Sequence, residues 1–63
     1  MAKKITVWKK DTTPIFVEAG QDQSANYTLD GNWLELFLDL PNQRRQTFFL
    51  VAVDEVSSVE IEY

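Results

Sequence analysis

The sequence contains no cysteine and no histidine among its 63 residues. Without cysteine the fold cannot be cross-linked by disulfides, and without either residue type a structural zinc site would have to use carboxylates alone. The commonest general base and the strongest nucleophile of enzymes are missing as well. We therefore expect no bound metal or other cofactor, and a protein that is not an enzyme.

Long apolar runs are also missing. No segment approaches the roughly 20 apolar residues that cross a membrane. Lys3 and Lys4 are followed by only a short β-type run, without the apolar core of about 7 to 15 residues that a secretory signal has. Together with the lack of cysteine, these features predict a cytoplasmic protein that makes no contact with a membrane.

The length of the chain leaves room for one small domain, which we place over residues 1–63. A domain of this size buries only about 60% of the surface that its unfolded chain exposes, so its stability is small. Such domains rely on disulfides, metals, close packing or association with another chain. Because the composition excludes disulfides and disfavours a metal site, close packing and association remain as the means of stabilising the domain.

Short runs of β-forming residues, separated by turn signals, cover most of the chain, as is typical of an all-β fold. We expect strands at 4–9, 15–19, 27–29, 33–40, 46–53 and 59–63. Asp30-Gly31 between apolar runs predicts a hairpin. The polar segment 20–26 predicts the longest loop.

Two of these runs differ in how their apolar residues are placed. Every even position from 34 to 40 is leucine, and the odd positions include Trp33 and Phe37. A period of two indicates a strand, and we expect its leucine face to lie in the core. The run 46–53 is apolar on both faces, so we expect a strand that is covered on both sides.

The end of the chain predicts a turn between two strands. Residues 54–58 are typical of one helical turn, with Asp54 as its N-cap, and 59–63 alternate as a last strand. This ending resembles the last part of SH3-like barrels, where a 3₁₀ turn joins the final two strands. We expect a five- to six-stranded antiparallel SH3-like barrel or curled sheet, with one short 3₁₀ or helical turn before the last strand. The resemblance is one of topology and implies no function.

Large aromatic side chains are more numerous than one small core can hold. Exposed apolar patches mark interaction surfaces, and tryptophan and arginine are enriched where binding energy is concentrated. A pair of arginines at a predicted hairpin tip can also grip a carboxylate or phosphate. We predict a contact surface formed by Trp8, Trp33, Phe37, Phe48, Arg44 and Arg45. In the alternative, these aromatics enlarge a thin core and the segment 20–26 covers them.

The charges are unevenly distributed. The net charge is −4, although four of the six basic residues lie in the first ten positions. An acidic domain repels phosphate, which disfavours nucleic acid as a partner. The sequence therefore favours a non-catalytic, self-associating protein–protein interaction module, of the kind found among bacterial or phage accessory proteins that bind and modulate a partner.

Two alternatives stay open. The first is a small barrel that binds nucleic acid through Trp8, the N-terminal lysines and the arginines. The second is an acidic mimic of nucleic acid that blocks a DNA- or RNA-binding protein. Its carboxylates would be Asp54, Glu55, Glu60 and Glu62.

Overall fold

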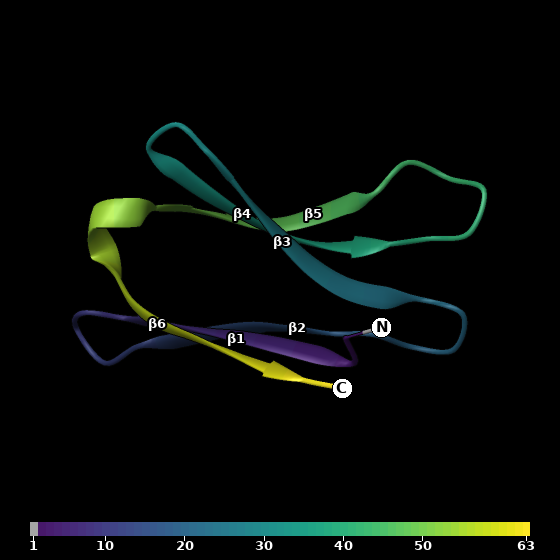
Figure 1. Cartoon of the computed structure of the whole chain (residues 1–63), viewed down its shortest axis with the longest axis horizontal. Coiled ribbons are helices and arrows are strands. Elements are labelled where there is room, and N and C mark those ends of the chain that lie inside the picture. The colour runs from purple at the N-terminus through teal and green to yellow at the C-terminus, as the bar shows by residue number, and fades with distance from the viewer. Residues whose placement is uncertain (1) are drawn as a thin grey trace.

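The computed structural model describes residues 2–63 and shows two antiparallel three-stranded sheets stacked on each other (Figure 1). The strand orders are β2-β1-β6 and β3-β4-β5. The elements are β1 (Lys4–Lys9), β2 (Pro14–Glu18), β3 (Ser24–Asp30), β4 (Trp33–Asp39), β5 (Gln46–Ala52), the 3₁₀ turn η1 (Val53–Glu55) and β6 (Val56–Glu62). An all-β fold with one short turn before its last strand is confirmed. No helix within residues 2–63 is long and apolar enough to span a bilayer.

The two sheets do not close into a barrel, so the expected closure is not observed. β1 packs over β3, and β2 packs over β3 and β4, whereas β5 and β6 lie at opposite margins of the sandwich with little contact across it. One corner is tied, because the Ala25 N–H donates to the Ala2 carbonyl at 2.9 Å. The result is a staggered, open sandwich.

The core lies between the sheets, where the even positions of β4 meet β1 and β2. Leu34, Leu36 and Leu38 are buried, as the period of two predicts. They pack in one cluster with Ile5, Val7, Val17 and Ala25. Burying each large aliphatic side chain contributes about 1.5 to 3 kcal/mol, so this cluster is the main source of stability.

The turn between β3 and β4 forms as the sequence predicts. Asp30 pairs with Trp33, which leaves Gly31 and Asn32 as a two-residue loop. Gly31 has a φ of +62°, and a positive φ at the first loop position is the feature of a type II′ turn that favours glycine.

Two local expectations are wrong. The segment 20–26 is not all loop, because β3 begins at Ser24, where small residues pair with β4 and with Ala2. Asp54 is not a cap, because η1 begins one residue earlier and its N-cap is Ala52, which has no side-chain acceptor.

The expectation that 46–53 is covered on both sides is also wrong. Val51 is the buried residue of β5, and its first five residues are all exposed. The reason lies in the stagger of the sheets, because β5 has little opposite it across the sandwich. Within residues 2–63, no strand pairs with the second edge of β5 either.

Candidate functional site

The outer face of the β3-β4-β5 sheet carries two large apolar side chains in the open. Trp33 is 53% exposed and Leu50 is 63% exposed. Together with Asp30 and Glu35 they line a shallow hollow of about 370 Å³. We call this surface the Trp33–Leu50 patch. Two of its four residues are acidic, and because Glu35 is paired with Arg45, Asp30 supplies the net negative charge at the rim of this apolar floor.

Phe37 was expected at the exposed surface, and the structure corrects this. Its ring is 5% exposed, because the Arg45 guanidinium lies over it, 4.5 Å from the ring centroid. Arg45 Nη2 is also 3.0 Å from Glu35 Oε1, and the Thr47 hydroxyl donates to the same carboxylate. Phe37 is therefore a buried residue beneath a charged lid, and Arg45 forms that lid.

Removing this lid should destabilise the domain by about 1 kcal/mol, because Arg45→Ala loses a cation–π contact, a partly exposed ion pair and the cover of an apolar ring. Urea unfolding followed by fluorescence measures the change. Arg44→Ala is the matched control, since Arg44 is the neighbouring arginine and is exposed. Equal unfolding midpoints for the two variants would show that Arg45 does not cover Phe37.

Phe48 and Arg44 lie near the patch but not in it. Phe48 is an exposed residue at a β-bulge, where the pairing of β5 shifts between Leu36 and Phe37 of β4. Arg44 lies in the loop before β5 and is exposed. The structure therefore divides the predicted residues of this hairpin between the exposed Trp33–Leu50 patch, the lid over Phe37 and the exposed start of β5.

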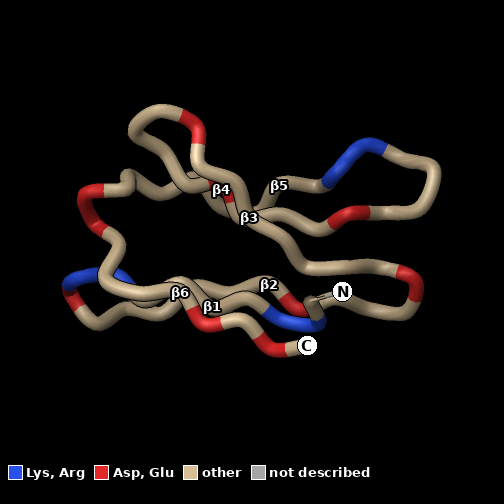
Figure 2. Tube along the Cα trace, viewed as in Figure 1, with Lys and Arg blue, Asp and Glu red and all other residues tan. Residues whose placement is uncertain are grey.

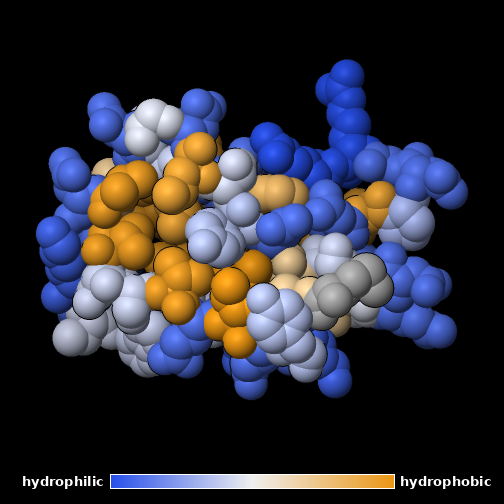
Figure 3. Space-filling view, in the orientation of Figure 1, coloured by the Kyte–Doolittle hydropathy of each residue, from blue (hydrophilic) through white to orange (hydrophobic). Residues whose placement is uncertain are grey.

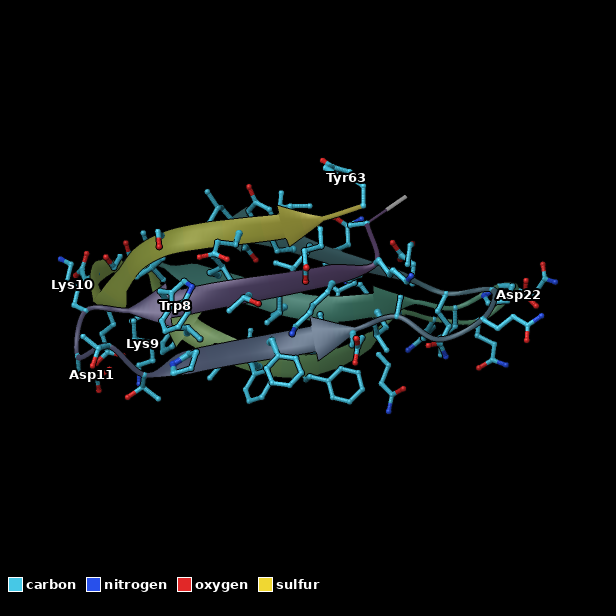
Figure 4. All side chains as sticks on the ribbon, turned by 90° about the horizontal axis from the view of Figure 1, so that it is seen from below. Trp8, Lys9, Lys10, Asp11, Asp22 and Tyr63 are labelled. Atoms are coloured by element: carbon cyan, nitrogen blue, oxygen red, sulfur yellow. The ribbon has the colours of Figure 1, made fainter. Side chains whose placement is uncertain are left out.

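Trp8 lies on the other sheet, away from these residues. Its indole Nε1 donates to Glu60 Oε1 at 2.9 Å on the outer face of β2-β1-β6 (Figure 4). On the same face, Lys4 Nζ lies 4.6 Å from the centre of the Phe16 ring. The structure thus separates Trp8 from the other five candidates, and its half-buried ring already has a hydrogen-bond partner.

The N-terminal lysines do not form one basic stripe. Lys3 and Lys4 lie at one end of β1, and Lys9 and Lys10 at the other, beside the hairpin tip (Figure 4). Acidic side chains interrupt them on both sides of the strand. In the register of the sheet, Lys4 pairs with Glu18 of β2 and Glu62 of β6. Charges of both signs therefore alternate along this sheet, as Figure 2 shows.

One carboxyl group has a perturbed acidity. The pKa of Asp11 lies below its ordinary value, because the Thr13 N–H donates to Asp11 Oδ1 at 3.0 Å. The Thr13 side chain and nearby Lys9 act in the same direction. Asp11 is fully exposed in the β1–β2 turn, so its lowered pKa reflects the hydrogen bonding of the turn itself.

The interior offers no polar chemistry in the part of the chain that the structure describes. Every buried residue there is apolar. In the same range, 2–63, no group of three or more acidic residues is placed to hold a metal ion. The candidate functional residues of the described chain are therefore surface residues.

The sequence did not identify the free edge of β5 as a feature. Each of the other edge strands carries a feature that hinders pairing with another chain. β2 begins with Pro14, β6 carries Glu60 and Glu62, and in β3 the Asn26 side chain accepts the Tyr27 N–H at 3.0 Å. β5 is Gln-Thr-Phe-Phe-Leu-Val-Ala and contains no charge and no proline. The lack of charge and proline in residues 46–52 is the sequence feature that could have identified this free edge.

The direction of the unpaired groups on β5 follows from one hydrogen bond. The Val53 N–H donates to the Asn32 carbonyl at 2.8 Å, so this residue pair bonds toward β4. Bonded and non-bonded pairs alternate along an antiparallel ladder. Leu50 therefore points its backbone N–H and C=O groups away from β4, toward the free edge, and so does the N–H of Ala52, whose C=O is the N-cap carbonyl of η1.

A second apolar surface lies on the side where β3 and β6 face outward (Figure 3). Leu29 of β3, Val53 of η1 and Ile61 of β6 are exposed apolar residues. This surface is the margin of the core at the unclosed side of the sandwich.

Comparison with protein-family models, curated proteins and solved structures finds no match for this chain.

Proposed function

We propose that the protein is a non-catalytic protein–protein interaction module that binds its partner through the Trp33–Leu50 patch. The observation that carries the proposal is the exposure of a tryptophan and a leucine side by side on the outer face of β4 and β5. Nothing within residues 2–63 covers them. Tryptophan is the residue type most enriched where binding energy concentrates, and an exposed one costs solubility.

The rim of the patch indicates the chemistry of the partner. Asp30 stands beside the apolar floor, Glu35 beside it is paired with Arg45, and the whole chain carries a net charge of −4. A complementary partner has an apolar anchor flanked by lysine or arginine. Because rim charges act mainly on the rate of association, we expect binding to weaken as salt is added.

A selection of peptides from a random display library on the immobilised protein tests this proposal. We expect the selected peptides to combine an apolar anchor with basic neighbours. Trp33→Ala should weaken their binding by about tenfold or more, as loss of a central aromatic anchor does. Phe16→Ala is the matched control, because Phe16 is 50% exposed on the outer face of the other sheet. Unchanged binding to Trp33→Ala would contradict the proposal.

Several finer expectations belong to the same proposal. We include an SH3-like course of the chain, supported by η1 between β5 and β6 and by the pairing of β6 with β1. We also include a cytoplasmic location and an accessory role in which binding modulates the partner. The alternating charges beside β1 and the bonded Trp8 ring give the two nucleic-acid alternatives less support.

A further inference from the structure

We propose that the free edge of β5 pairs with β5 of a second copy of this chain. The two strands run antiparallel about a two-fold axis near Leu50 and join two three-stranded sheets into one sheet of six strands. The proposal deepens the proposed function, since it names one partner of the same hairpin. It uses the edge of β5, whereas the Trp33–Leu50 patch lies on the face.

The edge itself supplies the first reason. β5 presents the unpaired N–H and C=O groups of Leu50 and the N–H of Ala52, with no charge or proline along its seven residues. Natural sheets block such edges, because they pair readily with other strands. A strand that is left open in this way, in a chain with three other blocked edges, is suited to pairing.

The charges at the two ends of β5 supply the second reason and select the partner. Arg44 and Arg45 precede the strand, and Asp54 and Glu55 follow it in η1 (Figure 2). An antiparallel pair of β5 strands places the basic end of each copy beside the acidic end of the other. A parallel pair would bring like charges together. The chain is therefore complementary to itself in one orientation.

The register follows from the faces of the strand. In a continuous sheet, residues that lie opposite each other share a face, so Leu50 of one copy faces an outer-face residue of the other. With Leu50 on the axis, the free N–H and C=O groups of the two Leu50 residues bond to each other. Phe48 of one copy then lies opposite Ala52 of the other, and the loop that carries Arg44 lies toward η1 of the other copy.

This register covers apolar surface that is open in a single chain. The two Leu50 side chains lie against each other, and Phe49 on the inner face lies opposite Val51 of the second copy. Trp33 is on β4, one strand away from the new pairing, so it stays exposed. The dimer therefore joins the two Trp33–Leu50 patches at Leu50 into one continuous face, with a Trp33 exposed on each side of the new pairing.

Sedimentation equilibrium over a dilution series tests the dimer. We expect the mass of the wild-type protein to rise with concentration to twice that of the monomer. Leu50→Lys places two lysines directly opposite each other, and it should weaken the dimer by about tenfold or more. Leu29→Lys is the matched control, because Leu29 is 61% exposed on edge strand β3 and Leu50 is 63% exposed on β5.

Single cysteines test the register, since the chain has none of its own. Leu50→Cys should form an intermolecular disulfide rapidly under mild oxidation. Ala52→Cys should cross-link far more slowly, because two Ala52 residues would be about 13 Å apart along the strands, beyond the reach of a disulfide. Leu29→Cys should behave as Ala52→Cys does.

Exchange of charges tests the orientation. Arg44→Glu should weaken the dimer by placing an acidic side chain beside Asp54 and Glu55 of the second copy. Adding Glu55→Arg to the same chain should restore part of the affinity, because the pair is then reversed. If Arg44→Glu and Glu55→Arg each weaken the dimer and the double variant shows no recovery, the antiparallel arrangement is excluded.

Two results would overturn the proposal. One is a monomer at every concentration, and the other is a dimer that Leu50→Lys and Leu29→Lys affect equally. A monomer that still loses its selected peptides on Trp33→Ala would overturn the dimer and leave the proposed function standing. A dimer whose peptide binding is unchanged by Trp33→Ala would overturn the proposed function and leave the dimer standing.

Discussion

Replacing Leu36 by alanine is expected to leave a large part of the protein unfolded at room temperature. Leu36 is fully buried at the centre of the cluster that joins the two sheets. Truncating such a leucine costs about 2 to 5 kcal/mol. A core in a domain this small rarely supplies more than about 3 to 5 kcal/mol, so the loss is close to the whole stability. Circular dichroism and urea unfolding measure it.

Leu50→Ala is the control for this result. Leu50 belongs to the exposed part of β5, and truncation of an exposed side chain usually changes stability by less than about 0.5 kcal/mol. Both variants are compared in dilute solution, so that association does not contribute. A Leu36 variant that unfolds at the wild-type urea concentration would contradict the two-sheet core.

The second large effect is expected from Phe37→Ala, with a loss of about 3 to 5 kcal/mol for a buried phenylalanine. The prediction depends on the lid, because Phe37 lies on the outer face of β4 and is sealed there by Arg45 and its partner Glu35. Thermal unfolding by calorimetry or circular dichroism measures the loss.

Trp33→Ala separates the two roles that aromatic residues have on β4. Trp33 is on the same strand and is more than half exposed, so its loss should change stability by less than about 1 kcal/mol. Should Phe37→Ala prove as stable as Trp33→Ala, the ring is not sealed by the guanidinium. Should Trp33→Ala prove as damaging as Phe37→Ala, Trp33 is a structural residue and the patch is not a binding surface.

The strands could be predicted from the sequence because their signals are local. The alternation of leucine with other residues in β4, and the Asp30-Gly31 turn, depend on neighbours within a few positions. β1 has the bounds that the sequence predicts, and β4 ends one residue before its predicted end. The leucine face is buried as expected.

The environment of β5 could not be predicted, because an apolar strand has the same pattern whether or not other elements cover it. What leaves it open is the stagger of the sheets, which depends on how β1 and β2 pack on β3 and β4. The absence of charge in β5 was visible in the sequence, but an absence of charge is also typical of a strand in the middle of a sheet.

The candidate site was predicted in part. Trp33 is exposed, as its position opposite the leucines implied. Phe37 shares that face but is covered by Arg45, and the contact depends on the β-bulge that places the start of β5 over the ring. Trp8 bonds to Glu60 near the other end of the chain. Such contacts between distant residues leave no periodic signal.

The central claim is that the free edge of β5 binds another strand, and amide hydrogen exchange across a dilution series tests it most directly. The Leu50 and Ala52 N–H groups should exchange quickly in dilute protein and become protected as the concentration rises, while the exposed Leu29 amide on the edge of β3 stays unchanged. Exchange at Leu50 and Ala52 that is equally fast at every concentration would contradict the claim.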